Sequence, residues 1–128
     1  MKLIGDFWNR NRNEEFIIEE AVLENAIDSL KKLDGIKKTE MILEQAYNSL
    51  NIAGGNNGLF ILNYFVGEEH SYFLTKKTDE KNRVTLVCGG QSGIFDAKNC
   101  FKIEYIFNVI SDYYEGKDIL SIYKWEVN

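Results

Sequence analysis

The stretch TEMILEQAYNSLNIAGGNNGLFILNYFV (residues 39–66) decides the fold, because its apolar residues alternate with polar ones. The alternation places Met41 and Leu43 on one face of a strand and Glu40, Ile42 and Glu44 on the other. A period of two residues is typical of a strand that is buried on one side. The start of the stretch therefore predicts a strand with one face in the core.

The rest of the stretch predicts two more strands joined by a turn. Leu50 and Ile52 point the same way in a short strand. The segment Gly54–Gly58 has the composition of turns that connect antiparallel strands. Residues 59–66 are apolar on both faces, which is typical of a central strand covered on both sides. Together these features indicate neighbouring antiparallel strands.

Two segments outside this stretch have the period of a helix. Apolar residues recur every three or four positions over residues 18–33 and again over residues 103–114. Gly35 and Gly116 follow these segments, and Gly35 is expected to stop the first helix in a left-handed conformation. Phe16–Ile18 fits either a strand or the start of the helix.

The remaining strands complete the fold prediction. Residues 9–13 are polar and are expected to form a loop, and a hairpin is expected around residues 78–82. The order predicts an α+β fold, β-α-β(n)-α-β, with a mainly antiparallel sheet of five to seven strands and two principal helices in a single domain, residues 1–128. The expected strands are Lys2–Trp8, Thr39–Leu43, Ser49–Ala53, Leu59–Val66, Ser71–Lys77, Arg83–Cys88 and Ile119–Val127.

The segment VTLVCGGQSGIFDA (residues 84–97) places three glycines directly after an alternating strand. Three glycines in five residues indicate backbone conformations or close approaches that a Cβ atom would forbid. Neither this segment nor Gly54–Gly58 continues into Gly-Lys-Ser/Thr, so neither matches a phosphate-binding loop. The segment is interpreted as a shaped surface rather than as a reaction centre.

The composition predicts a globular, cytoplasmic protein that binds other proteins. The chain has 128 residues and a formal net charge of −5, so a nucleic-acid backbone is repelled and a basic protein is attracted. The first residues lack the apolar core of a signal peptide, and the longest apolar run, residues 59–66, is too short to cross a bilayer. We expect no nucleic-acid partner and no membrane partner.

Residues that carry catalysis are scarce. His70 is the only histidine and lies in a predicted turn beside Glu68 and Glu69, where a lone histidine is normally solvated. Cys88 and Cys100 do not have metal-ligand spacing, and reduced thiols are expected in a cytosolic protein. The serines do not form a nucleophile elbow. The sequence therefore predicts a protein that is not an enzyme and that uses neither a cofactor nor a metal.

Acidic residues are the main candidates for a binding site. They bracket the strand at residues 39–43 and occupy both predicted hairpin turns, although acidic turns are also common on solvated surfaces. Tyrosines such as Tyr47, Tyr72 or Tyr113 are candidates if they are exposed, because tyrosine is enriched in binding hot spots. The candidate partner-binding residues are Glu40, Glu44, Glu68, Glu69, Tyr72, Asp79, Glu80 and Gln91.

Three groups of short segments follow one another along the chain: LDG (33–35) with KTEMILE (38–44), LNIAGG (50–55) with GLFI (58–61), and GGQSGIFDA (89–97) with YKWE (123–126). In this order they resemble the helix end, the glycine-rich turn and the closing segments of the first-numbered family of bacterial immunity proteins. Members of that family are the antidotes encoded beside polymorphic and contact-dependent toxins. Lys38 and Ala53 depart from the family pattern, which has arginine and glycine there.

The resemblance implies a function that the residues alone do not show. It implies that the chain binds and neutralises the C-terminal domain of a cognate toxin, a nuclease or a nucleic-acid deaminase, by covering its active site or substrate cleft. The glycine motif is then expected to serve the scaffold, since it is shared by proteins with different partners. The alternative is an acidic secretion chaperone or adaptor that binds another protein.

Overall fold

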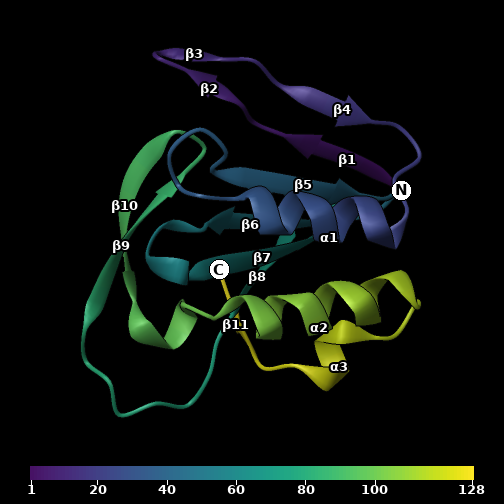
Figure 1. Cartoon of the computed structure of the whole chain (residues 1–128). Coiled ribbons are helices and arrows are strands. Elements are labelled where there is room, and N and C mark those ends of the chain that lie inside the picture. The colour runs from purple at the N-terminus through teal and green to yellow at the C-terminus, as the bar shows by residue number, and fades with distance from the viewer.

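The computed structural model of the chain describes residues 1–128 and has an α+β fold. Seven strands form one sheet in the order β11-β8-β7-β6-β5-β1-β4, and every neighbouring pair is antiparallel. Figure 1 shows the sheet behind two long helices. The seven strands are β1 (Lys2–Gly5), β4 (Phe16–Ile18), β5 (Glu40–Glu44), β6 (Asn48–Gly54), β7 (Phe60–Val66), β8 (His70–Leu74) and β11 (Trp125–Val127).

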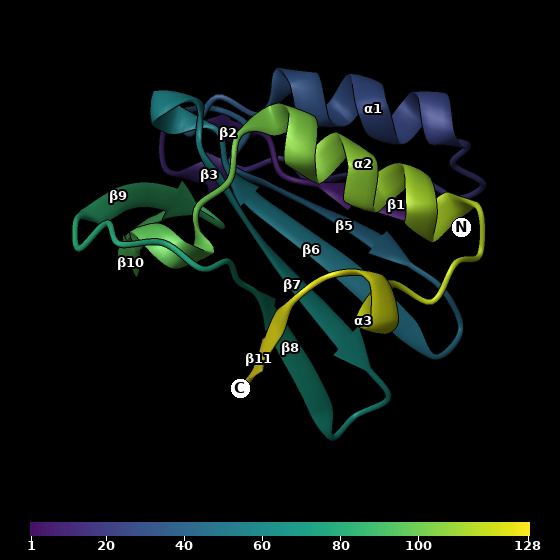
Figure 2. The ribbon, with the colours of Figure 1, turned by 90° about the horizontal axis from the view of Figure 1, so that it is seen from below.

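The two long helices, α1 (Leu23–Lys32) and α2 (Ile103–Tyr114), lie side by side over one face of the sheet (Figure 2). Their buried stripes pack on the inward residues of the strands, and these groups form the main core. A short helix, α3 (Ile119–Ile122), precedes β11. Buried residues at this interface include Ala26, Ile27 and Leu30 from α1, Ile106, Val109 and Ile110 from α2, and Leu3, Met41, Leu43, Leu50, Ile52 and Leu62 from the sheet.

A hairpin of β9 (Arg83–Cys88) and β10 (Gln91–Asp96) forms a second layer on the other face of the sheet. Leu86 on β9 packs with Ala53 and Ile61, and Phe95 on β10 meets Phe73 edge to face. The short helical turns η1 (Asn56–Gly58) and η2 (Ala97–Asn99) flank this layer. The hairpin covers only the end of the sheet where β6 ends and β7 begins.

The predicted alternation in residues 39–66 is confirmed. Met41 and Leu43 are buried, while Glu40 and Glu44 lie on the other face. The prediction that β7 is covered on both sides holds for its first half only, since Phe65 is 37% exposed.

The predicted hairpin between residues 71–77 and 83–88 is wrong. β8 pairs with β7 and β11 instead, and residues 75–82 leave the sheet. β9 pairs with β10 across a two-residue turn, in which Gly89 and Gly90 have φ of +60° and +79°. Positive φ at both central residues is the requirement of a type I′ hairpin turn, which glycine meets without strain. The glycine pair was therefore the turn signal for β9.

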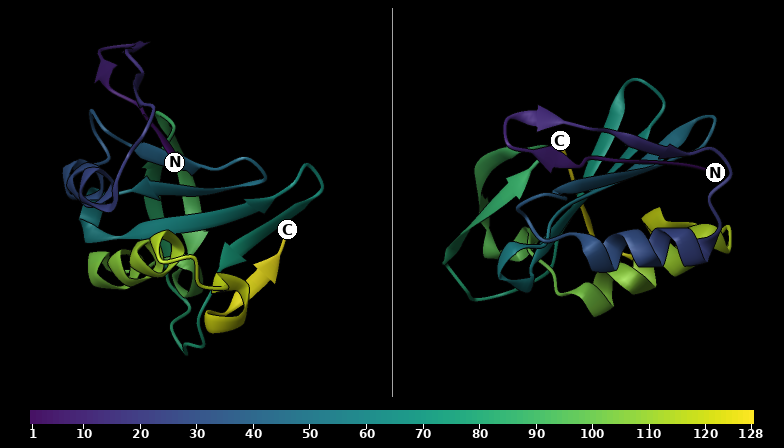
Figure 3. Two further views of the ribbon diagram at one scale, coloured as in Figure 1. Left: turned by 90° about the vertical axis from the view of Figure 1, so that its right-hand side faces the viewer. Right: turned by 45° about the horizontal axis from the view of Figure 1, so that its top comes forward.

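Three further expectations at the chain ends need correction. Residues 9–13 form a small hairpin of β2 (Trp8–Asn9) and β3 (Arg12–Asn13), which extends away from the main sheet in Figure 3. Phe16–Ile18 is strand β4, and the helix begins only at Leu23. Residues 119–127 are not one strand, because α3 takes the first part of them. Gly35 is left-handed as expected, with φ of +72°.

Candidate protein-binding surface

Several motif segments meet around the carboxylate of Asp6, which is buried directly after β1. This carboxylate accepts hydrogen bonds from the backbone N–H of Thr39 (2.7 Å), the backbone N–H of Glu40 (3.0 Å) and the indole N–H of Trp8 (2.7 Å). It also accepts one from the Thr39 hydroxyl, whose oxygen in turn accepts a bond from the N–H of Gly90 at 2.9 Å. The glycine turn is thereby fastened to the start of β5.

A second set of contacts holds the other motif segments together. A Cβ atom on Gly55 would overlap the backbone carbonyl of Leu33. The next residue, Asn56, donates through its amide to the carbonyl of Thr85 (2.9 Å) and accepts from the N–H of Val87 (3.1 Å). The motif segments at residues 33–44, 50–58 and 85–90 therefore contact one another and hold the scaffold together. Residues 123–126 lie apart from them, where Glu126 bonds to Thr75 and Asn99.

Glu40 is half-buried under the turn of the β9–β10 hairpin. A Cβ atom on Gly89 would lie 3.2 Å from its Oε2. Burial raises the pKa of this carboxyl, and the charges of Asp6 and Glu15 raise it further. Burial also raises the pKa of the Cys88 thiol to about 11, with a contribution from Glu40. A thiol that stays protonated at neutral pH is a poor nucleophile.

Replacing Glu40 with glutamine is expected to raise the stability at pH 7. A carboxyl whose pKa is raised on folding binds its proton more tightly in the folded state, so stability falls as the pH rises through the window between the unfolded and folded pKa values. Glutamine has no charge to bury and avoids this loss. Thermal melts should give the variant the higher Tm at pH 7 and nearly equal Tm values at about pH 4, where both side chains are mostly neutral. Equal Tm values at pH 7 would contradict the prediction.

The sheet face turned away from the helices is only half covered. Beyond the part under the β9–β10 hairpin, the strand register gives two rows of directly opposed residues, all of them partly or fully exposed. We call these two rows the open face: Ile17, Ile4, Ile42, Asn51 and Asn63 in the first, and Lys2, Glu44, Ser49, Phe65 and Ser71 in the second.

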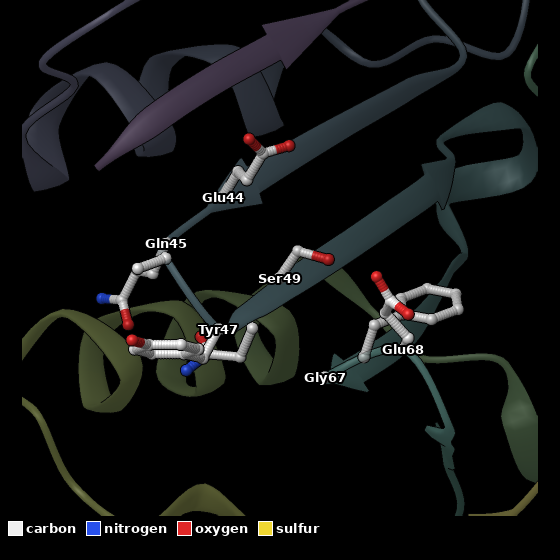
Figure 4. A pocket seen from close by; sticks show the side chains of 9 residues that line it. Glu44, Gln45, Tyr47, Ser49, Gly67 and Glu68 are labelled. Carbon is white, nitrogen blue, oxygen red and sulfur yellow. The ribbon is translucent and has the colours of Figure 1, made fainter.

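The open face combines apolar side chains with one carboxylate, Glu44, which stands opposite Lys2, and a second carboxylate, Glu68, lies at its end. Ile17 is 47% exposed and stands beside two other isoleucines in the first row. Figure 4 shows Glu44, Ser49 and Glu68 around a shallow pocket of about 320 Å³ at the far end of this face. Tyr47, in the β5–β6 turn, lines the same pocket and is 83% exposed. Such a surface offers contact area and charge but no reacting group.

The acidic candidates fall into separate places. Glu44 and Glu68 line the pocket, and Glu69 follows in the β7–β8 turn. Glu40 and the exposed Gln91 lie at the tip of the β9–β10 hairpin, at the other end of β5. The structure brings the first three together and leaves the other two apart from them.

The remaining candidates lie elsewhere. Tyr72 is directly opposite Tyr64, on the face that carries the helices. Asp79 and Glu80 are exposed in the 75–82 segment, beyond the end of β8. Tyr113 is buried and its hydroxyl donates to the Asn48 side chain, so it is unsuited to an interface. The open-face residues that sequence reasoning missed are Ile4, Ile17, Ile42 and Phe65, whose only signal was their place on the outward side of the alternating pattern.

Four lysines line a hollow at the opposite end of β8 from the pocket. Only one of these side chains, Lys98, has a carboxylate partner, Glu126, at 3.2 Å. The molecule is therefore acidic around the β5–β6 and β7–β8 turns and basic where β8 ends. The lysines that line a hollow of about 480 Å³ at this basic end are Lys76, Lys77, Lys98 and Lys124.

The side chains capable of chemistry are dispersed. His70 is exposed at the start of β8, and Cys88 and Cys100 are free thiols. No group of three or more His, Cys, Asp or Glu side chains is placed to hold a metal ion. None of the helices has the length and apolar character needed to cross a bilayer.

The chain was compared with family models, curated proteins and solved structures. No family model matches it, and neither does any curated protein or solved structure.

Proposed function

We propose that the protein is an immunity protein, which binds the C-terminal domain of a cognate toxin and covers its active site or substrate cleft. The observation that carries the proposal is the open face, which has exposed Phe65 beside the carboxylates of Glu44 and Glu68 at one end and exposed Ile17 on its edge strand β4. The resemblance of the motif segments to bacterial immunity proteins is the reason for proposing that the partner is a toxin.

Charge favours a basic partner for this surface. A toxin that acts on nucleic acid, such as a nuclease or a deaminase, needs a basic cleft to bind its substrate. A complementary acidic surface raises the rate of association with such a cleft, while buried apolar and aromatic contacts slow dissociation. Tyr47 and Phe65 supply aromatic groups at the acidic end of the open face.

The test is co-expression with the C-terminal domain of the protein encoded directly upstream of this chain. We expect cells that carry that domain alone to stop growing and cells that carry both to grow. Equal growth inhibition with and without this chain would refute the immunity role. A stable complex with a harmless partner would favour the secretion chaperone or adaptor role instead.

Charge reversal at the pocket should affect toxin binding more than charge reversal at Asp79 and Glu80. The double change Glu44→Lys and Glu68→Lys is expected to slow association with the toxin domain by about tenfold at low salt, because it removes the charges that steer a basic partner. The double change Asp79→Lys and Glu80→Lys is the matched control and should have little effect. Association rates measured by surface plasmon resonance check this, with thermal melts to show that both variants fold. Equal slowing by both pairs would show that net charge alone steers association, and no slowing by the pocket pair would remove the pocket from the interface.

A further inference from the structure

The longest free strand edges in the molecule belong to the β9–β10 hairpin, and only the β9 edge has backbone groups bonded by Asn56. β10 has six residues and pairs only with β9, while the edge strands of the main sheet, β4 and β11, have three each. Its sequence, QSGIFD, contains neither proline nor lysine, the residues that normally protect an edge from pairing. Ile94 in the middle of it is 68% exposed.

The hydrogen-bond alternation identifies which groups lie on this edge. Asn56 binds the carbonyl of Thr85 and the N–H of Val87, so these two residues point their backbone groups away from β10. The register places Val87 opposite Ser92 and Thr85 opposite Ile94. In an antiparallel pair, opposed residues share the same bonding pattern, so Ser92 and Ile94 point their N–H and C=O groups outward on the other edge.

This edge faces the open face. Leu86 on β9 packs over Ala53 and Ile61, which stand in the covered row of the main sheet. Phe95 on β10 packs on Phe73, which belongs to the next row, the one that contains the three isoleucines. β10 thus lies closer to the open face than β9 does, and its free edge borders the uncovered rows.

The hairpin forms a second layer that covers one end of the sheet and leaves the rows of the open face uncovered. Packed sheets lie about 10 Å apart, and strands within a sheet lie about 4.8 Å apart. Rows on one face of a sheet lie two residues, about 6.8 Å, apart. Because Phe95 of β10 already reaches Phe73 in the first row, one more strand beside β10 would lie over the boundary between the first and second rows. There its inward side chains would meet Ile17, which is 47% exposed, and the partly buried Ile4 and Ile42.

Resting on the proposed function, we infer that the toxin contributes an extended segment that pairs with β10 and completes the second layer over the open face. The side chains of this segment that point toward the sheet are apolar over the isoleucines, and basic residues where the segment continues toward the pocket meet Glu44 and Glu68. The charges favour a basic segment at the pocket end of this face, because Glu44 and Glu68 line the pocket and no lysine or arginine does. Within the two rows themselves, Lys2 stands directly opposite Glu44. Arg83, at the base of the hairpin, is already paired with Asp96 at 3.5 Å.

The experiment uses the C-terminal domain of the upstream-encoded protein as the probe, with two proline variants. Ser92→Pro removes an outward N–H on the free edge and leaves the bonds to β9 intact, since proline only lacks its own donor. Thr85→Pro is the matched control on the opposite edge of the same hairpin. We expect Ser92→Pro to weaken binding about tenfold or more and Thr85→Pro to leave it within about threefold. Circular dichroism melts establish that both variants fold.

If Ser92→Pro fails to fold, the inference is tested by a second variant, Ile17→Asp, and by hydrogen exchange of the wild-type complex. Ile17→Asp should weaken binding by a similar factor, while Ile122→Asp, an exposed isoleucine on α3, should not. Hydrogen exchange of the wild-type complex should show slowed exchange at the amides of Ser92 and Ile94.

The outcomes separate this inference from the proposed function. If the probe binds and is neutralised but Ser92→Pro and Ile17→Asp bind it normally, the inference is wrong and the immunity role stands. If the probe is neither bound nor neutralised, both are wrong. If the Ser92 and Ile94 amides become protected in the free protein as its concentration rises, a second copy of the chain occupies the edge and the inference is again overturned.

Discussion

Replacing Asp6 with alanine is expected to lower the free energy of unfolding by about 3–5 kcal/mol, because it leaves buried donors without an acceptor. Asp6 is 3% exposed and receives two backbone N–H groups, the Trp8 indole and the Thr39 hydroxyl. Water cannot replace the carboxylate without opening the contact between β1, β5 and the glycine turn. Urea unfolding followed by circular dichroism measures the change.

The control for Asp6 is Asp79→Ala, which removes an exposed carboxylate from the 75–82 segment and should change the unfolding free energy by less than about 0.5 kcal/mol. Asp6→Asn is expected to fall between the two, since its amide oxygen can still accept the two backbone N–H groups but its NH2 faces two donors. A loss below about 1 kcal/mol in Asp6→Ala would show that the network contributes little to stability.

The local part of the fold could be predicted because it depends on the spacing of apolar residues within single strands and helices. The period of two placed Met41 and Leu43 inside and Glu40 outside, and the period near 3.6 located both long helices. These patterns depend on neighbours within one element, so no knowledge of the rest of the chain is needed. The antiparallel order of β5, β6 and β7 followed from short connections.

Strand partners that depend on distant residues could not be predicted. Two turn signals, residues 78–82 and Gly89–Gly90, competed for the strand at 83–88, and contacts with distant residues place it: Leu86 packs on Ala53 and Ile61, and Asn56 bonds to the backbone of Thr85 and Val87. The same limit explains the 119–127 segment, where the indole N–H of Trp125 donates to the carbonyl of Ile119 and helps to hold a short helix.

The candidate surface was found only in part for a related reason. Acidic turns are visible in the sequence, so Glu44 and Glu68 were named, but their meeting at one pocket depends on which hairpins share an end of the sheet. The isoleucine row joins residues 4, 17 and 42 across three strands, and only the register places them side by side. A single outward isoleucine in each strand carries no signal by itself.

The motif glycines give the last prediction. Gly90→Val is expected to lower the free energy of unfolding by about 3–5 kcal/mol, from left-handed strain of about 1–2 kcal/mol and a steric overlap on top of it. Gly90 has φ of +79°, and a Cβ atom there would overlap the Trp8 indole. The ring cannot easily move, because its N–H is bonded to Asp6.

Gly67→Val separates the two causes. Gly67 has φ of +63° in the β7–β8 turn, but a Cβ atom there meets no other atom within 4 Å, so only the strain of about 1–2 kcal/mol is expected. The difference between the two variants isolates the clash with Trp8, and it should shrink when both are compared in a Trp8→Ala background. Equal losses at Gly67 and Gly90 would leave strain alone as the cause. A Gly90→Val variant of normal stability that no longer binds the toxin domain would move the glycine turn from the scaffold to the interface.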